Sequence, residues 1–245
     1  MKTLRRKILL ALSLPVDFFK KGEGFIYQPY NFLYFLLRFR PGSIRDAIGQ
    51  LIKLEEVGKI IRNNVLYFRL TGAGRERLLS FFPISLGQSR VWDGKWKIVI
   101  GAPRILKPKL AGLGFKKLTK GVYMTPMPVS RQVKNCLLEK NLLGKVIVIE
   151  SRRILAGDNR NLAQKLWKLE NLAKEYRSFI SQCRRLLKKM KGQKGLKDRY
   201  KIKVVELFDA YFLLLSEDPG LPKRVLIDDW PADFAREIFL KIFEN

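Results

Sequence analysis

Residues 92–96, with the sequence WDGKW, run directly into KIVI at residues 97–100 and divide the chain into two kinds of sequence. Asp-Gly between two tryptophans is a turn signal, and the apolar run that follows is typical of a strand. The stretch predicts that the chain enters a new sheet here. A plain hairpin or strand start explains the same residues without a binding role for the tryptophans. We therefore expect Trp92 and Trp96 to pack a junction between two structural units.

Composition limits the classes of protein that the chain can be. Its 245 residues are 47% hydrophobic and 29% charged, which is enough apolar material for two or three small cores. The formal net charge is +27, and a field of that sign attracts polyanions, with nucleic acid the leading partner. Residues 204–245 differ, since they hold 9 acidic and 4 basic residues. This acidic segment either shields part of the basic surface or stays away from the polyanion.

Several chemistries are excluded by residue counts. The chain has no histidine, which removes Ser-His-Asp and Cys-His catalysis and every zinc site that contains histidine. Its two cysteines, Cys136 and Cys183, are far apart, which argues against a disulfide framework and fits a reducing cytoplasm. No apolar run approaches the roughly 20 residues that span a bilayer. We therefore expect no catalytic group, no metal, no cofactor and no membrane partner.

The first predicted unit, residues 1–89, begins with helices. Residues 4–14 predict a helix rather than a signal peptide, because Pro15 and Asp17 cut the apolar run short. Residues 30–38 predict a second helix. Pro41-Gly42 then makes a turn, and Ser43 is a suitable N-cap for a third helix over residues 43–57, with Asp46 completing a capping box.

A hairpin follows this third helix. Residues 59–62 and 65–70 predict two strands joined by Asn63-Asn64, residues that tolerate positive φ, and Thr71 caps another helix. Three helices, a hairpin and a closing helix in this order predict a winged helix-turn-helix. Such units also serve as protein–protein modules.

The predicted DNA contacts lie on the third helix and the hairpin. Arg45 and Gln50 are residue types that read base edges, and Lys53, Arg62 and Arg69 suit phosphates. The full predicted set is Ser43, Arg45, Gln50, Lys53, Arg62, Asn63 and Arg69. A solvated helix face and a surface hairpin are the alternative, since Asp46 and Gly49 make this face less basic than an ideal DNA reader.

The rest of the chain predicts two further domains. Residues 90–155 show the order β-α-β-β-α-β, which is that of a ferredoxin-like βαββαβ fold, with Ser130 capping a helix over residues 131–140. Residues 156–245 are helical, with one long helix over 161–187, a basic loop at 188–195, and helices over 204–215 and 232–243. The predicted fold class is α+β, with domains at 1–89, 90–155 and 156–245.

A family resemblance rests on motifs in order along nearly the whole chain. They are WDGKW at 92–96, GLGF at 112–115, GVYMTP at 121–126, Trp167 with YRSF at 176–179, DPGLP at 218–222 and DWP at 229–231. With the winged unit, these motifs resemble the PaaX family of bacterial transcriptional repressors, named for control of phenylacetate degradation.

The resemblance implies an N-terminal winged helix-turn-helix, a central ferredoxin-like domain similar to the small CRISPR adaptation nuclease, and a helical C-terminal domain. It also implies a homodimer on an inverted repeat in promoter DNA and an acyl-CoA-like effector, since the type member releases DNA on binding phenylacetyl-CoA. In one place the chain departs from the family: residues 101–104 read GAPR where the family has an Asp-Ile-Pro-Glu-like segment. A nuclease of this fold would need a carboxylate there to hold a cation, so nuclease activity is not expected.

These observations predict a sequence-specific DNA-binding transcriptional regulator, a dimeric repressor in the cytoplasm. One alternative is a nucleic-acid-binding or processing protein without sequence preference. Its surface would be the basic face of the central domain, with Lys95, Lys97, Lys116, Lys117 and Lys120. A second alternative is an acyl-CoA binder or enzyme, against which stands the lack of any nucleophile–base spacing.

Overall fold

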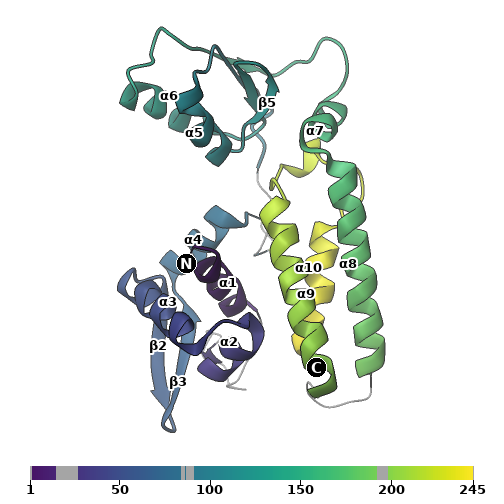
Figure 1. The fold of residues 1–245 in the computed structure, drawn as a ribbon. Helices are drawn as coiled ribbons and strands as arrows, with labels where there is room; N and C mark the ends of the chain where they lie inside the picture. Colours follow the sequence, from purple (N-terminus) through teal and green to yellow (C-terminus); the bar gives the residue numbers. More distant parts are fainter. Residues whose placement is uncertain (1, 15–26, 84–85, 87–90, 192–197, 245) are drawn as a thin grey trace. The chain divides into compact units, whose positions relative to one another are not determined.

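The computed structural model describes residues 2–14, 27–83, 86, 91–191 and 198–244 (Figure 1). The chain forms two compact units, one of Met1–Gln88, Ala173–Asp218 and Pro231–Asn245, the other of Ser89–Leu172 and Pro219–Trp230. Both contain helices and an antiparallel sheet, which confirms the predicted α+β class. The division at residues 89/90 and 155/156 into three domains stays a prediction. Among the described residues no helix is long and apolar enough to cross a membrane.

The N-terminal part of the first unit combines four helices with a small sheet whose strand order is β1-β3-β2. Its elements are α1 (Lys2–Leu12), β1 (Gln28–Pro29), α2 (Tyr30–Leu37), α3 (Pro41–Lys53), β2 (Val57–Arg62), β3 (Val65–Leu70) and α4 (Gly72–Phe81). The predicted hairpin is confirmed: β2 and β3 pair antiparallel, and Asn63 and Asn64 have φ of 47° and 62°. Such positive φ values suit asparagine at a two-residue turn.

The predicted cap of α4 is also confirmed. The Thr71 side chain accepts a hydrogen bond from the Gly74 amide at 3.0 Å, while its hydroxyl donates to the Glu55 carbonyl at 2.6 Å. This arrangement brings Gly74 against the end of the α3–β2 connection. A Cβ atom at Gly74 would lie 1.9 Å from the Glu56 carbonyl oxygen, so only glycine fits there.

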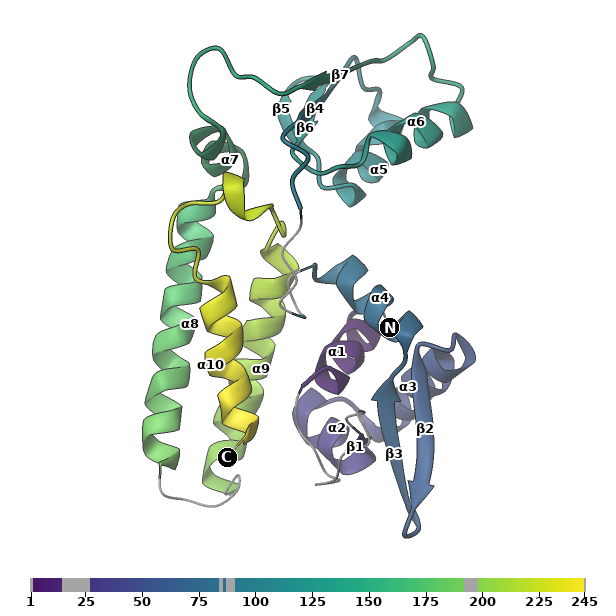
Figure 2. The same cartoon turned by 180° about the vertical axis from the view of Figure 1, so that it is seen from behind.

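Three further helices, which belong to the first unit except for residues 169–172, lie side by side in both views (Figures 1 and 2). They are α8 (Leu169–Met190), α9 (Asp198–Glu217) and α10 (Ala232–Glu244). One aromatic ring from each helix meets in their core, because the Phe179 and Tyr211 ring centroids lie 5.7 Å apart and those of Tyr211 and Phe239 lie 4.7 Å apart. Buried aromatic side chains of this size dominate the packing of such helices.

Two predictions for the helical region were wrong, and a third is described only in part. The single helix over 161–187 is two helices, α7 (Asn159–Trp167) and α8, because Lys168 takes a left-handed φ of 53° and ends α7. Phe234, which its helical spacing from Ile238 and Ile242 in the predicted helix 232–243 places on an inward face, is 41% exposed and lies beneath the Arg184 guanidinium at 5.0 Å. Residues 192–197 of the predicted basic loop lie outside the described residues.

The second unit is built on a four-stranded sheet with strand order β5-β6-β4-β7, in which all neighbours are antiparallel. Its elements are β4 (Trp96–Ile100), the 3-10 helix η1 (Arg104–Leu106), α5 (Lys107–Gly112), β5 (Lys116–Thr119), β6 (Val122–Thr125), α6 (Ser130–Glu139), β7 (Ile147–Ser151), α7 and the 3-10 helix η2 (Lys223–Val225). The predicted order of strands and helices, β-α-β-β-α-β, is present along this segment as β4, α5, β5, β6, α6 and β7.

Each face of this sheet has its own core. Trp96 is 1% exposed and packs with Met124, Met127, Trp167 and residues of the segment 221–226. Val99, three residues further along β4 and so on the opposite face, packs instead with residues of α5 and α6. The Trp96 indole also donates a hydrogen bond to the Asn159 side chain at 2.8 Å. Trp96 therefore joins β4 to α7 inside the second unit. Its predicted place at a junction between two units stays a prediction.

Candidate nucleic-acid interface

Helix α3 starts earlier than the sequence predicted. It begins at Pro41, a residue whose fixed φ suits the first helical turn, and its N-cap is Arg40, whose side chain makes no capping bond. The prediction that Ser43 is the N-cap is therefore wrong, and no capping box with Asp46 forms at that residue. The helix also ends earlier, since Glu55 has φ of 56° and Val57 already belongs to β2. Ser43 and Asp46 are exposed on the surface of the helix.

The two faces of α3 separate as an amphipathic helix requires. Ile44, Ala47, Ile48 and Leu51 are buried. Leu54, which helical spacing from Ile44, Ile48 and Leu51 predicts on the same stripe, is instead 55% exposed beyond the helix end. The predicted DNA contacts Arg45 and Lys53 are exposed.

Gln50, the second predicted base reader, is partly buried. Its side-chain oxygen accepts a hydrogen bond from the Arg5 guanidinium of α1. This bond ties α3 to α1. The side-chain oxygen of Gln50 is therefore already occupied by a hydrogen bond within the protein.

The hairpin places the other predicted contacts at different distances from its turn. Asn63 is exposed at the turn and Arg62 is half-buried beside it, paired across the strands with Val65. Arg69 lies further back, opposite Gly58, with its guanidinium 5.9 Å from the centre of the Tyr27 ring. Apolar side chains are also exposed near the turn, including Ile61 at 70%.

A hollow of about 500 Å³ lies between α3 and the hairpin, which are neighbouring elements in Figure 2. It is lined by Tyr30, Pro41, Arg45, Ile48, Gly49, Ile52, Lys59, Leu66 and Phe68. Of the predicted contacts, only Arg45 lies in this hollow. Lys59, which sequence reasoning missed, adds a second cation. Counting back from the predicted Asn63-Asn64 turn pairs Lys59 with Phe68, and this register is the signal that could have indicated it.

Tyr30 fixes the edge of this hollow. Its hydroxyl donates to the Pro41 carbonyl at 2.6 Å and so ties the start of α2 to the start of α3. Burial raises the pKa of the Tyr30 phenol, an effect that the nearby Arg45 charge partly offsets. The hydroxyl therefore stays protonated and keeps its role as a donor at neutral pH.

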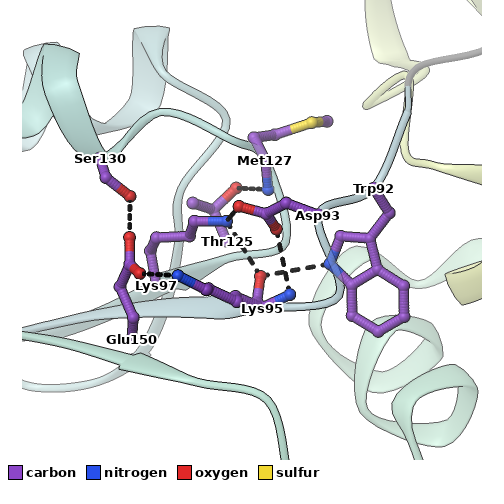
Figure 3. A network of polar contacts seen from close by, with 8 residues as sticks. All are labelled: Trp92, Asp93, Lys95, Lys97, Thr125, Met127, Ser130 and Glu150. Atoms are coloured by element: carbon purple, nitrogen blue, oxygen red, sulfur yellow. Dashed lines mark hydrogen bonds and ion pairs between the residues drawn. The ribbon is translucent and has the colours of Figure 1, made fainter.

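The basic face of the central domain was the alternative nucleic-acid surface, with five predicted lysines. Two of these five are paired with carboxylates. Lys97 is 0% exposed, and its ammonium group contacts the Asp93 carboxylate and, at 3.2 Å, the Lys95 carbonyl (Figure 3). Lys95 forms an ion pair with Glu150 at 2.6 Å, and the Ser130 hydroxyl donates to the same carboxylate. The prediction that Lys97 belongs to a basic face is wrong, while Lys116, Lys117 and Lys120 are exposed.

The same network explains a second wrong prediction, that Ser130 caps a helix. Helix α6 begins at Ser130 itself, with Val129 as its N-cap, and the Ser130 hydroxyl is directed to Glu150 on β7. Burial acts to raise the pKa of Asp93, and the hydrogen bonds from Lys97 and the Lys95 amide outweigh it, so the pKa lies below its usual value. Hydrogen bonds from Lys95 and Ser130 likewise lower the pKa of Glu150.

No metal centre or reactive thiol emerges from the geometry. In residues 2–14, 27–83, 86, 91–191 and 198–244 there is no group of three His, Cys, Asp or Glu side chains that could hold a metal ion. Gly101, at the end of β4 where a nuclease of the similar fold would need a carboxylate, has φ of 76° and leaves the strand. Cys136 and Cys183 are both buried free thiols, and burial raises the pKa of Cys183 to about 12.

Comparison with known protein families first identifies the class of the C-terminal region. Residues 167–245 match the family model of the PaaX-like protein C-terminal domain. The matched segment contains Trp167 and the helices α8, α9 and α10.

A particular relative extends that match. The chain is 26% identical over 166 residues to a protein of Escherichia coli (strain K12) named transcriptional repressor PaaX. The alignment covers 63% of this chain and 52% of the relative, about half of that protein's length. Together the two findings confirm the predicted resemblance to the PaaX family.

Proposed function

We propose that this chain is a sequence-specific DNA-binding transcriptional repressor. The observation that carries the proposal is the arrangement of α3 beside the β2–β3 hairpin, in the order α1-β1-α2-α3-β2-β3 with a β1-β3-β2 sheet. That order is the one expected of a winged helix-turn-helix, in which the third helix enters the major groove and the hairpin touches the backbone beside it. The name of the relative, a transcriptional repressor, supports the same function.

The proposal divides the chain into three domains. Residues 1–89 are the winged helix-turn-helix, residues 90–155 a ferredoxin-like domain and residues 156–245 a helical domain. The strand order β5-β6-β4-β7, with two helices packed on one face, supports the ferredoxin-like assignment. No catalytic step is assigned to any domain, since the chain has no histidine and its cysteines are buried.

Three roles are proposed for the DNA contacts. Arg45 reads a base edge from the exposed face of α3, near the first turn that also carries Ser43. Lys53, Arg62 and Asn63 contact phosphates on either side of the groove. Arg69 lies behind the turn, where its guanidinium faces the Tyr27 ring. Its first role is to stabilise the hairpin, and a phosphate contact comes second.

Gln50 has a conditional role. A glutamine reads adenine through both its oxygen and its amide nitrogen. Because the oxygen accepts from Arg5, Gln50 contributes to base reading only when that bond breaks and the side chain turns outward.

The remaining parts of the proposal rest on the family resemblance. They are a homodimer, an inverted repeat in promoter DNA, an acyl-CoA-like effector that controls binding, and a cytoplasmic location. The net charge of +27 supports a polyanionic partner and is silent on the effector.

Selection of bound duplexes from random DNA, using the full purified chain, tests the function. We expect an enriched inverted repeat whose half-sites lie about 10 base pairs apart or a multiple of that spacing, because a two-fold dimer contacts successive major grooves on one side of the duplex. Recovery of unrelated sequences after repeated rounds would contradict sequence-specific reading.

The alternative function, binding without sequence preference through the central domain, keeps one supporting observation. All four residues of β5 are exposed, including Lys116 and Lys117, and Lys120 is exposed in the turn that follows. Under this alternative, changing the three lysines to glutamine lowers the slope of log affinity against log salt by about 3, and the Arg45→Ala change leaves affinity unaltered. The repressor proposal expects the opposite pattern on a selected site.

A further inference from the structure

A basic pocket lies between α1 and α4, which are neighbours in both views (Figures 1 and 2). The charged side chains that line it are Lys2, Arg5, Arg6, Glu56 and Arg77. With four cations and one acid, these described side chains carry a formal charge of +3. The volume of about 250 Å³ is below the roughly 300–1,000 Å³ of sites for small organic ligands, so the pocket suits a single phosphate group.

The cations of the pocket are only partly neutralised by the protein. Arg77 pairs with Glu56 at 3.5 Å, longer than the distance of a strong charged hydrogen bond, and its side chain is 54% exposed. The guanidinium groups of Arg6 and Arg77 lie 4.4 Å and 4.7 Å from the centre of the Phe81 ring, which therefore holds both cations beside the pocket. In the described lining, one carboxylate thus faces the guanidinium groups of three arginines.

Arg5 connects this pocket to α3. A terminal nitrogen of its guanidinium, Nη2, donates to the Gln50 side-chain oxygen, while the buried Nε has no acceptor among the described residues. Leaving a buried donor without an acceptor is unfavourable. Nε and Nη2 form one edge of the guanidinium, and such an edge binds two phosphate oxygens through parallel hydrogen bonds. A phosphate at this edge would satisfy Nε and would compete with Gln50 for Nη2.

The pocket lies on one flank of the proposed reading helix, and the hairpin lies on the other. Arg45, Gly49 and Ile52 of α3 line the hollow beside the hairpin. On the opposite flank Gln50 contacts α1 and Leu54 lines the basic pocket. A helix in the major groove has a sugar–phosphate backbone on each side. The hairpin is proposed to contact one backbone, and the basic pocket is in a position to contact the other.

We propose that this pocket binds one phosphate of the DNA backbone and that Arg5 moves from Gln50 to this phosphate when DNA binds. Gln50 is then released to turn outward and read a base, so its contribution depends on the phosphate contact beside it. The inference rests on the proposed function. It adds a phosphate site outside the predicted contacts and identifies the event that breaks the bond between Arg5 and Gln50.

Fluorescence anisotropy with the full chain tests the site, using the selected duplex and a scrambled one at several salt concentrations. The test variant is Arg6→Gln with Arg77→Gln. The control, Arg75→Gln with Arg177→Gln, removes the same charge from exposed positions outside the pocket. We expect the test variant to bind both duplexes about fivefold or more weakly, with the slope of log affinity against log salt lowered by about 1. The control should change affinity by less than about twofold.

Gln50 supplies the readout for the release step. In the natural chain, Gln50→Ala should lower the preference for the selected over the scrambled duplex severalfold, through one lost base contact. The same change in the test variant should lower the preference by less than about twofold, because without a bound phosphate Arg5 keeps its bond to Gln50. A structural role of the pocket alone would not change the effect of Gln50→Ala.

Two results would overturn the inference. Equal losses in the test and control variants would mean that DNA responds only to the net charge, and an undiminished effect of Gln50→Ala in the test variant would mean that no phosphate releases Gln50. A natural chain that does not distinguish the two duplexes contradicts the proposed function instead, while the salt slope on the scrambled duplex still tests the pocket. Melting followed by circular dichroism verifies folding. Arg77→Gln alone, which keeps Arg6 on Phe81, replaces the double variant if the latter is less stable, with the same expected direction.

Discussion

In the four-stranded sheet, the central strand β4 buries Lys97 completely against Asp93, whereas in the three-stranded sheet Arg62 and Asn63 stand at the turn of the β2–β3 hairpin. Both regions are basic in sequence and both were candidates for nucleic-acid contact. The difference lies in the neighbouring carboxylates: Asp93 pairs with Lys97, and Glu150 pairs with Lys95. A count of basic residues therefore overstates the basic surface of the central domain.

The largest expected effect concerns the core that gives the four-stranded sheet its rigidity. Trp96→Ala should destabilise the second unit by about 3–5 kcal/mol, because it removes a fully buried indole and leaves a cavity between β4 and α7. Urea unfolding followed by tryptophan fluorescence and far-UV circular dichroism measures the loss. Leu155→Ala, at a side chain 89% exposed, is the control and should change stability by less than about 0.5 kcal/mol. Equal stability of the two variants would contradict the structural role of Trp96.

The buried ion pair gives the next largest effect. Asp93→Ala should cost about 2 kcal/mol, since it leaves the Lys97 ammonium buried without its carboxylate partner, donating to the Lys95 carbonyl. Lys97→Met should cost less, because it removes the buried charge itself, and the double variant should be more stable than Asp93→Ala alone. A double variant whose loss equals the sum of the two single losses would show that the pair is not coupled. DNA affinity should stay unaltered in all three.

On the hairpin the expectation is reversed. Arg62→Gln should lower affinity for DNA of any sequence severalfold, through one lost phosphate contact, and should change the free energy of unfolding by less than about 1 kcal/mol. Fluorescence anisotropy at several salt concentrations measures the first quantity and urea unfolding the second. A large loss of stability with unaltered DNA affinity would place Arg62 with Lys97 as a structural cation.

The smallest effect is a pH dependence. Because the pKa of Asp93 is lowered in the folded state, its contribution to stability is present above its unfolded pKa of about 4 and is lost as the pH falls through the folded value. The stability difference between the natural chain and Asp93→Asn should therefore be constant from about pH 7 to pH 5 and should shrink below about pH 4. Urea unfolding midpoints across this range measure it, and a difference that grows on acidification would contradict the sign.

Local signals in the sequence predicted much of the fold. Asn63-Asn64 marked a turn, Thr71 marked a helix start, and the apolar run after residue 96 marked a strand, since each follows from backbone preferences. The start of α3 was misplaced because Pro41 competes with Ser43 for the first helical position and wins through its fixed φ. The break at Lys168 had no local signal, because lysine has no preference for a left-handed φ.

The candidate site was harder to predict than the fold, since it depends on contacts distant in sequence. The bond between Gln50 and Arg5 joins residues 45 positions apart, and the ion pair of Lys95 joins it to Glu150, 55 positions away. Neither follows from periodicity or capping. Only the structure indicates that Gln50 is partly engaged and that Lys97 is buried.

The central claim is that α3 reads DNA, and the most direct test uses a duplex obtained by selection with the natural chain. The measurement compares the affinities of the natural chain and of Arg45→Ala with Gln50→Ala for this duplex and for a scrambled one. We predict that the double change reduces affinity for the selected duplex by about tenfold or more and nearly removes the preference over the scrambled duplex, because a lost base contact from Arg45 alone costs about 1–3 kcal/mol and Gln50 can no longer turn outward to add another. Unaltered affinity together with unaltered preference would contradict the assignment of α3 as the reader.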